Sequence, residues 1–277
     1  MAAILNVTPD HLDRYPNFDA YKQAKAHLFD RQLPEDVAIA PAADAECRAM
    51  AQASRAKVSL FGQPDGAVRI EAGMLVDDVT GLRVPMDEIG IKGAHNMSNA
   101  ACSALISRHV GVDAAAIRTT LQRFRGLAHR MQFVREIGGV SYFDDSKATN
   151  VGAAVAALDG MDPMHEGLVV ILGGKHKGAS YAPVVERLKH RGRAVVLIGE
   201  ATALLKAALQ PSGLRIECAA SMKDAVWTAQ ALARSGDAVL LAPACSSYDM
   251  FDSYVQRGEA FQEAVRALGE LSSKEAC

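Results

Sequence analysis

Polar side chains crowd the turn after one predicted strand, in the stretch FDDSKATN at residues 143–150. Three other predicted strands end in comparable clusters, GGKHKGAS at 173–180, GEAT at 199–202 and PACSSYDMF at 243–251. Loops at the carboxyl ends of parallel strands open on one edge of a sheet, and helix N-termini add partial positive charge there. We therefore expect an anion-binding site at this edge. The lysines and hydroxyl groups that could converge on the anion are Lys147, Thr149, Lys177, Ser246 and Ser247.

A second cluster, NVTPDHLDRY, follows the first predicted strand and holds Asp10 and His11. Hard cations such as Mg²⁺ take oxygen ligands, and histidine is a less usual partner. The same residues could simply begin a helix capped by Thr8. In the helix that follows, composition alone does not distinguish Lys25 from an ordinary solvated lysine. Each loop described above, taken singly, could likewise be an ordinary surface loop.

Two further motifs carry polar side chains at places where a ligand could lie. RGLAHRMQFV puts His129 and Arg130 at a predicted domain boundary, where they could reach a ligand or serve only as linker cations. GAHNMSNAACSAL puts Asn96 and Asn99 on one face at a helix start. Asn96 could be only a cap. Asn99 needs another role, such as an adenine contact or a buried hydrogen bond.

Strand-like and helix-like segments alternate along the chain, which predicts an α/β fold with a largely parallel sheet. The alternation becomes regular after Gly126, where we place a domain boundary, and predicts a Rossmann-like sheet for residues 127–277. Within residues 1–126 the pattern is less regular. Residues 66–92 predict short antiparallel strands, and AAILNV predicts a short buried strand at the start of the chain.

Composition narrows the function classes. The 277 residues suit one large or two medium domains, and a net charge of −2 gives no reason to expect nucleic acid as a partner. No apolar run is long enough to span a membrane, and the N-terminus lacks signal-peptide features, so we expect a cytoplasmic protein without membrane insertion. The five cysteines show no CxxC spacing and indicate reduced thiols. No GxxxxGKS or GxxxxGKT phosphate loop occurs.

The ordered set of motifs resembles the Mur ligase family. The motifs are NVTPDHLDRY with YKQAKAHLF, GAHNMSNAACSAL, FRGLAHRMQFV, FDDSKATNVGAAVAAL, LGGKHKG and LAPACSSYDMFDSYVQRGEAFQEAV, and they extend from residue 4 to residue 269. DSKATN is similar to the loop of the D-glutamate-adding member, whereas sister ligases typically have Asp-Tyr-Ala-His or Asp-Ala-Tyr-Asn there. The resemblance implies an incomplete central ATPase domain at residues 1–126 and a Rossmann-like C-terminal ligase domain at 127–277.

The resemblance also implies a reaction, in peptidoglycan precursor synthesis. ATP would phosphorylate the carboxylate of UDP-N-acetylmuramoyl-L-alanine, and the amine of D-glutamate would attack the acyl phosphate. ATP and Mg²⁺ are the implied cofactors, because negative charge builds up on the phosphoryl group and on the tetrahedral intermediate. A dicarboxylate substrate would need a cation and hydroxyl donors, which DSKATN supplies.

The resemblance assigns roles to individual residues. His11 would be a magnesium ligand, and Lys25 would be the family lysine that is carbamylated and lies beside the metal. Lys147 would face the phosphates or the second substrate, which makes it the third implied catalytic residue with His11 and Lys25. The residues implied in binding the base and ribose of ATP are Asn99, Arg130 and Asp145. Those implied in holding the carboxylates of D-glutamate are Thr149, Lys177, Ser247 and Tyr254. Asn96 and His129 are secondary candidates.

The sequence departs from the family pattern in several places. The UDP-binding domain, the phosphate loop and an upstream magnesium-binding glutamate have no counterpart here, so we expect little or no activity from this chain alone. An N-terminal half supplied separately is therefore a further expected partner. Tyr254 stands where the family often has Phe. Two alternatives stay open: a sister Mur or folylpolyglutamate-type ligase, against which DSKATN and ACSSYDMF argue, and a non-catalytic module that binds a nucleotide or amino acid.

Overall fold

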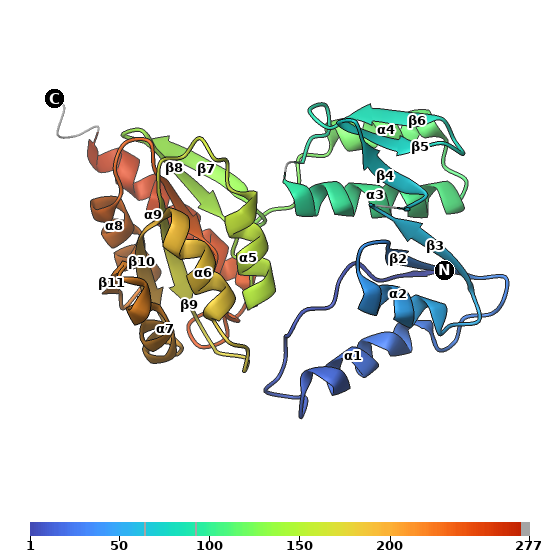
Figure 1. The fold of residues 1–277 in the computed structure, drawn as a ribbon. Helices are drawn as coiled ribbons and strands as arrows, with labels where there is room; N and C mark the ends of the chain where they lie inside the picture. The colour runs from blue at the N-terminus through green and yellow to red at the C-terminus, as the bar shows by residue number, and fades with distance from the viewer. Residues whose placement is uncertain (64, 92, 273–277) are drawn as a thin grey trace. The chain divides into compact units, whose positions relative to one another are not determined.

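Two compact units make up the computed structural model, which describes residues 1–63, 65–91 and 93–272 (Figure 1). The N-terminal unit holds Met1–Thr8 and Tyr15–Gly126. The C-terminal unit holds Pro9–Arg14 together with the chain from Leu127 onward. No sequence signal predicted that Pro9–Arg14 packs with the second unit. The interpretation of this segment as a helix start is wrong, because it forms a turn and an irregular loop.

A six-stranded mixed sheet, with strands in chain order, forms the centre of the N-terminal unit. Its strands are β1 (Ala2–Ala3), β2 (Val37–Pro41), β3 (Lys57–Phe61), β4 (Val68–Glu71), β5 (Met74–Asp77) and β6 (Leu82–Pro85). β1 to β4 pair in parallel and β4 to β6 pair antiparallel, which confirms the prediction of antiparallel strands here. The strand predicted for AAILNV is shorter than expected, because only its first two residues pair with β2.

Helices cover both faces of this sheet. Alternate residues of β2 point to opposite sides, so each face presents apolar side chains that a helix can bury. The helices are α1 (Phe18–Ala26), the 3₁₀ turn η1 (His27–Phe29), α2 (Ala45–Gln52), α3 (Ala94–His109) and α4 (Ala114–Arg123). Ile39 packs into the core shared with α3 and α4, whereas Ala38 and Ala40 pack with α2 and Phe29. Side-chain caps begin three of these helices, from Asn17, Asp44 and Asp113.

The C-terminal unit also contains a six-stranded sheet, in the order β11-β10-β9-β12-β8-β7. Its strands are β7 (Gln132–Ile137), β8 (Val140–Asp144), β9 (Leu168–Gly173), β10 (Gly192–Ile198), β11 (Arg215–Cys218) and β12 (Ala238–Leu241). All neighbours pair in parallel except β7, which is antiparallel to β8. β7 was missed from the sequence, where its residues were assigned to a linker. The predicted α/β fold with largely parallel strands is confirmed.

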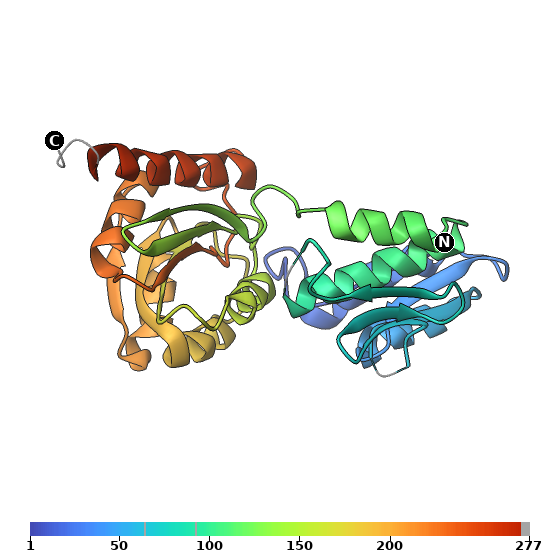
Figure 2. The same cartoon turned by 90° about the horizontal axis from the view of Figure 1, so that it is seen from above.

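Helices lie on both faces of the C-terminal sheet as well (Figures 1 and 2). They are α5 (Val151–Gly160), α6 (Ala182–Arg191), α7 (Thr202–Leu209) with the 3₁₀ turn η2 (Gln210–Ser212), α8 (Met222–Leu232) and α9 (Tyr254–Ser272). Along β9, Val170 and Leu172 pack with α5, α6 and α7, while Val169 and Ile171 pack with α8 and α9. Every residue of β9 is buried, as expected for a central parallel strand with helices on both faces.

β8, β12 and β9 are adjacent strands, so the loops that follow them meet at one edge of the sheet. This confirms that the polar loops after residues 144, 173 and 241 open together. Gly173 and Gly174 allow the loop after β9 to lie close to the loop after β12. Both have φ of 129°, and a Cβ on Gly174 would lie 2.2 Å from the Ser246 carbonyl oxygen.

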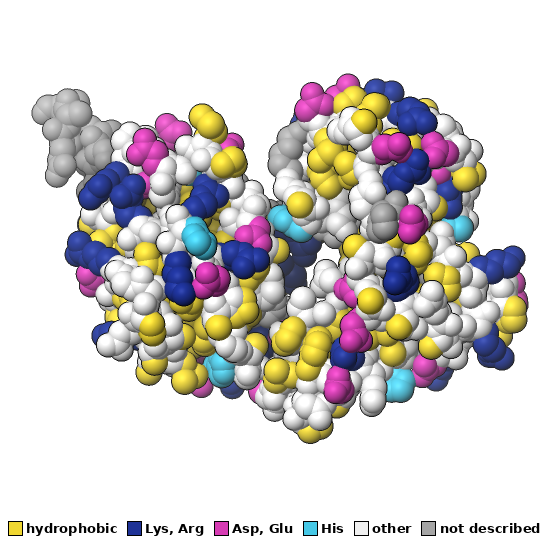
Figure 3. Space-filling model, viewed as in Figure 1, with side chains coloured by type: hydrophobic (Ala, Val, Ile, Leu, Met, Phe, Trp, Pro, Cys, Tyr) yellow, Lys and Arg dark blue, Asp and Glu magenta, His cyan; other side chains and the backbone are white. Residues whose placement is uncertain are grey.

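Two further properties concern the part of the chain that the structure describes. None of its helices combines the length and the apolar character needed to cross a membrane. Its four cysteines are free thiols, of which only Cys218 is exposed; the fifth, Cys277, lies outside the described residues. On the face seen in Figure 3, acidic and basic side chains are interspersed.

Candidate active site

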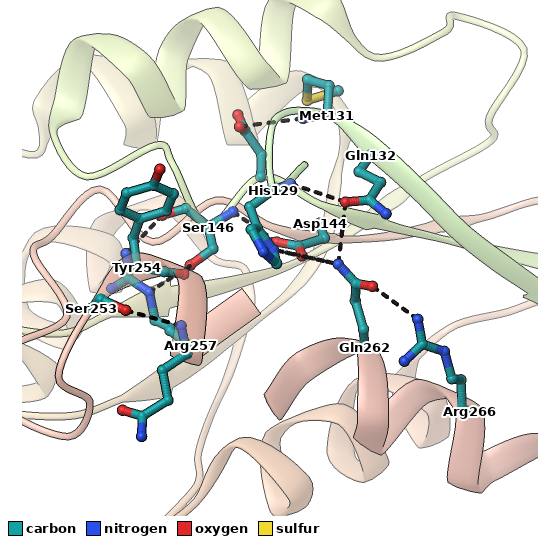
Figure 4. Close-up of polar contacts among 12 residues, drawn as sticks. His129, Met131, Gln132, Asp144, Ser146, Ser253, Tyr254, Arg257, Gln262 and Arg266 are labelled. Carbon is teal, nitrogen blue, oxygen red and sulfur yellow. Dashed lines mark hydrogen bonds and ion pairs between the residues drawn. The ribbon is translucent and has the colours of Figure 1, made fainter. Parts of the chain in front are cut away.

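One buried arginine ties together the three loops at the carboxyl edge of the C-terminal sheet. Arg257, near the start of α9, is 1% exposed. Its guanidinium donates to the carbonyl oxygens of Ser146 (2.9 Å) and Cys245 (3.1 Å) and to Ser146 Oγ (3.0 Å), as Figure 4 shows in part. A longer contact of 3.5 Å reaches the Gly173 carbonyl oxygen. A single side chain therefore fixes the ends of β8, β9 and β12 relative to one another.

The guanidinium of Arg257 places a buried positive charge beneath this edge of the sheet. No carboxylate forms an ion pair with Arg257 among the residues described, and the oxygens that it contacts belong to neutral groups. Burial lowers the pKa of Arg257 to about 10, which leaves the guanidinium charged at neutral pH. The carboxylates of Asp249 and Asp144 lie near enough to stabilise this charge but form no direct ion pair with it, so the guanidinium can also attract a bound anion.

His129 and Asp144 form a buried pair beneath the DSKATN loop (Figure 4). Nδ1 of His129 lies 2.7 Å from Oδ2 of Asp144, and Gln262 donates to the same oxygen at 2.7 Å. The other carboxylate oxygen of Asp144 accepts the Ser146 N–H at 2.9 Å, and the His129 carbonyl accepts the Lys147 N–H at 3.0 Å. His129 therefore holds the loop that carries Asp145 and Lys147.

Asp145 is a buried carboxylate with few stabilising partners. It is 6% exposed, and its Oδ1 accepts one backbone N–H, from Met131 at 3.3 Å. Burial raises the pKa of Asp145 to about 7, while the Met131 N–H and the nearby Arg130 oppose the rise. Arg130 is half-buried. Asp145 and Arg130, both predicted to bind the nucleotide, thus lie close enough to interact.

Lys147 of the DSKATN loop contacts Tyr254, the first residue of α9. The Lys147 ammonium lies 4.1 Å from the centre of the Tyr254 ring, a cation–π contact. The Tyr254 ring packs edge-on against His129, with ring centres 6.3 Å apart. Its carbonyl oxygen accepts the Ser146 hydroxyl at 2.7 Å. Lys147 is exposed, so its ammonium can leave the ring for a ligand.

Lys177 has a different partner, Asp10 from the segment Pro9–Arg14. Its ammonium lies 2.6 Å from Asp10 Oδ1, and both side chains are about 10% exposed, at 11% and 9%. Asn150 donates to Asp10 Oδ2 at 2.8 Å and also caps α5. Burial alone would raise the pKa of Asp10, but the hydrogen bonds from Lys177 and Asn150 together lower it. The two predicted lysines therefore each have a partner of their own, and the structure does not show them converging on one point.

The remaining predicted substrate residues lie in the same loops. Thr149 precedes Asn150 and is half-buried, and Ser247 is 3% exposed in the loop after β12. Ser246 donates to the Lys175 carbonyl and pairs with that residue through the backbone, which links this loop to the glycine-rich one. Thr149, Lys177 and Ser247 are thus all placed at one edge of the sheet.

Three predicted residues belong to the N-terminal unit. Lys25 is exposed on α1, with its ammonium 5.1 Å from the centre of the Tyr21 ring. Asn99 is half-buried on α3 and donates to Asn96 at 3.4 Å. Asn96 is buried inside the helix, and Gly93 occupies the cap position, so the interpretation of Asn96 as a cap is wrong.

A complete magnesium site is not formed by the residues that the structure describes. No group of three or more His, Cys, Asp and Glu side chains among them is arranged to hold a metal ion. Asp10, which lies next to His11, already accepts three hydrogen bonds, from Lys177, Asn150 and the His11 N–H. Magnesium prefers octahedral oxygen coordination, which Asp10 and His11 alone do not supply. The roles of His11 and Lys25, which belong to different units, stay predictions.

Backbone strain is concentrated in these loops. Among the residues that the structure describes, five non-glycine residues have positive φ, and four of them lie in the loops of this site: His11, His129, Met131 and Ala244. Such conformations cost free energy and persist where the surrounding contacts impose them, which is common at functional sites.

Sequence reasoning missed four of the residues that build this edge. Asp144 and Asn150 stand inside the quoted loop, and Asp10 stands in the second cluster, but no partner could be assigned to any of them. Arg257 gave no signal, because an arginine on an amphipathic helix usually faces solvent. Its contacts with the loops after β8, β9 and β12 are visible only in three dimensions.

Family models match both parts of the chain. The model described as "Mur ligase middle domain" matches residues 1–107, and the model described as "Mur ligase, glutamate ligase domain" matches residues 129–245. Two curated relatives are named UDP-N-acetylmuramoylalanine–D-glutamate ligase. The protein from Pelotomaculum thermopropionicum is 36% identical over 97% of this chain and 60% of its own length; that from Geotalea daltonii is 39% identical over 97% and 59%. The chain therefore spans about 60% of the length of these relatives.

Solved structures with the same fold include other ligases. A pseudomurein peptide ligase type C from Methanothermus fervidus has a TM-score of 0.75 at 15% identity, covering 96% of this chain and 63% of the other. A MurF ligase from Thermotoga maritima, in complex with ADP, has a TM-score of 0.69 at 16% identity, covering 96% and 62%. At such low identity these likenesses show the fold alone.

Proposed function

Because this chain belongs to the Mur ligase family, we propose that it provides the D-glutamate site and part of the nucleotide site of an ATP-dependent ligase that extends UDP-N-acetylmuramoyl-L-alanine. The observation that carries the proposal is the meeting of three polar loops above the buried guanidinium of Arg257. The names of the curated relatives support the choice of D-glutamate. The proposal also places the reaction in peptidoglycan precursor synthesis in the cytoplasm.

D-Glutamate carries two carboxylates, which need separate cationic or hydroxyl partners. In this proposal Lys177 and Thr149 hold one carboxylate, and Ser247 with the start of α9 at Tyr254 holds the other. Arg257 lies beneath both and stabilises their charge without contacting them. Charge-assisted hydrogen bonds of this kind are roughly twice as strong as neutral ones.

The nucleotide lies, in this proposal, on the other side of the DSKATN loop. Asp145 accepts hydrogen bonds from ribose hydroxyl groups, and Arg130 contacts the base and ribose; the predicted role of Asn99, which belongs to the N-terminal unit, remains a prediction. Lys147 turns from the Tyr254 ring toward the phosphates. ATP supplies the phosphoryl group that activates the substrate carboxylate. The roles of His11 and Lys25 at a magnesium ion remain predictions.

Calorimetric titration of the purified chain tests the proposal. D-Glutamate should bind more tightly than L-glutamate and meso-diaminopimelate, and Lys177→Ala should weaken D-glutamate binding roughly 10- to 100-fold, the value of one charged hydrogen bond. Lys175→Ala is the matched control, because Lys175 is exposed in the same loop and engages its neighbours through its backbone. Equal binding of all three amino acids, or equal effects of the two variants, would contradict the proposal.

The same titration separates the other interpretations. A sister ligase would prefer a different amino acid, such as meso-diaminopimelate. A binding module without catalysis would bind D-glutamate but would release no phosphate from ATP, even after addition of the N-terminal part of a curated relative. In the presence of UDP-N-acetylmuramoyl-L-alanine, which accepts the phosphoryl group, phosphate release that depends on both D-glutamate and that added part would support the ligase.

A further inference from the structure

We infer that Asp10 binds the α-amino group of the incoming amino acid, so that Asp10 and Lys177 together recognise an amino acid as an ammonium and a carboxylate on one carbon. This inference rests on the proposed function and adds a residue to the site. It starts from the position of Asp10, which lies in the C-terminal unit although the chain on both sides of it belongs to the other unit.

Asp10 is held at the meeting point of two substrate loops. Asn150, next to Thr149, donates to its Oδ2, and Lys177 donates to its Oδ1. The backbone reinforces this position, since the Leu12 N–H donates to the Lys177 carbonyl at 3.1 Å. Leu12 also lies against Gly178, where an added Cβ would come within 3.0 Å of the Leu12 side chain. Asp10 is therefore fixed beside Lys177 by contacts on several sides.

The hydrogen-bonding capacity of the two side chains leaves room for a ligand. A lysine ammonium has three N–H donors, and Lys177 uses one of them on Asp10. An ionised carboxylate offers about four acceptor positions. Asp10 uses three of them, for Lys177, Asn150 and the His11 N–H, while Nε2 of the His11 ring lies 3.7 Å from Oδ2, too far for a hydrogen bond. One donor direction of Lys177 and one acceptor direction of Asp10 can thus serve the same small ligand.

The chemistry of an α-amino acid matches this pair. Its ammonium and its α-carboxylate are attached to the same carbon, so a carboxylate bound to Lys177 brings the ammonium next to Asp10. The pairing also offsets repulsion, because an anionic ligand without an ammonium would set its carboxylate beside that of Asp10. Like charges so close to each other in a poorly solvated site disfavour binding.

The inference distinguishes D-glutamate from ligands of the same shape that lack a free ammonium. Glutarate has both carboxylates and no amine, and N-acetyl-D-glutamate has a neutral amide in its place. The unaltered chain should bind D-glutamate at least tenfold more tightly than either. In Asp10→Asn this preference should disappear, through weaker binding of D-glutamate together with unchanged or tighter binding of glutarate.

Calorimetric titration of the whole chain with the three ligands tests the inference. Asp13→Asn is the matched control, because Asp13 lies in the same segment and its side chain is 43% exposed; this variant should keep the preference for D-glutamate. Equal binding of D-glutamate and glutarate to the unaltered chain overturns the inference and leaves the proposed function standing. Failure of the unaltered chain to bind D-glutamate overturns both.

The variant distinguishes recognition of the ammonium from a purely structural role. If Asp10→Asn weakens D-glutamate and glutarate by the same factor, Asp10 only holds Lys177 in place and the inference is wrong. If the variant does not fold, as judged by the fluorescence of Trp227, the comparison of the three ligands on the unaltered chain decides, because it requires no substitution.

Discussion

Replacing Asp145 by asparagine should stabilise the C-terminal unit at neutral pH. Asp145 is 6% exposed, and burial raises its pKa to about 7 from the usual 3.8 of an aspartate. Between these two values the unfolded chain is ionised at Asp145 while the folded chain is protonated there. The contribution of Asp145 to stability is thus fully present below about pH 4 and is lost as the pH rises through 7. Asparagine resembles the neutral form at every pH.

The size of the stability gain follows from how far burial raises the pKa of Asp145. Each pKa unit corresponds to about 1.4 kcal/mol, so the full shift of about 3 units would cost about 4 kcal/mol above pH 7. Part of this cost is already present at pH 5. The gain in unfolding free energy for Asp145→Asn should therefore grow by about 2–3 kcal/mol between pH 5 and pH 8.

Urea unfolding followed by tryptophan fluorescence measures this gain. The chain has a single tryptophan, Trp227 on α8, so the signal reports on the C-terminal unit. Asp144→Asn is the matched control at the neighbouring position. It should destabilise the unit at both pH values by about 1–3 kcal/mol. Asp144 Oδ2 accepts a hydrogen bond from the Gln262 amide, and the NH₂ group of an asparagine at this place would be a second donor facing that amide. A gain for Asp145→Asn that is the same at pH 5 and pH 8, or a loss at both, would refute the reasoning.

Two further predictions concern Arg257 and the cysteines of the C-terminal unit. Arg257→Met should lower the unfolding free energy by about 3 kcal/mol, because three acceptors on Ser146 and Cys245 lose a charged donor, and Arg257→Lys should lower it less. If both variants are as stable as the parent in urea unfolding, Arg257 does not join the loops. Alkylation of the native chain, followed by peptide mass spectrometry, should modify Cys218 before Cys245, because Cys218 is exposed while burial raises the pKa of Cys245 to about 11. Rapid modification of Cys245 would show that the loop after β12 opens readily.

The regular part of the fold could be predicted because local patterns and tertiary structure agree there. The apolar run LVVILG is buried at every position, as a central strand requires, and Gly, Ser and Asp follow the strands where loops begin. β7 was missed because its alternation of apolar and polar residues stands next to a motif that was interpreted as a linker. Only pairing with β8 across the Gly138–Gly139 turn makes it a strand.

The candidate site was predictable as a set of loops but not as a set of contacts. Lysines and hydroxyl groups after adjacent strands point to a common edge, since strand order alone brings those loops together. The partner of each lysine depends on long-range packing. Lys147 rests on Tyr254 and Lys177 pairs with Asp10, and neither pairing leaves a trace in local sequence patterns.

The packing of Pro9–Arg14 with the C-terminal unit, although the chain on both sides of it belongs to the N-terminal unit, has a consequence for the order of folding. The contact between Asp10 and Asn150 spans 140 residues, so forming it closes a very long loop of chain. Contacts of such large sequence separation are entropically costly until the elements that they join are already structured. The sheet of the C-terminal unit, whose neighbouring strands are closer along the chain, can form without them.

Asp10 should therefore enter its position late, after the loops that end β8 and β9 are in place. During synthesis, Asp10 leaves the ribosome long before Asn150 and Lys177, and its contacts can form only after both have emerged. Cutting the chain at Gly126 would give a C-terminal piece that keeps its sheet and loops but lacks the carboxylate beside Lys177. The last contact to form would thus be one that the proposed amino-acid site requires.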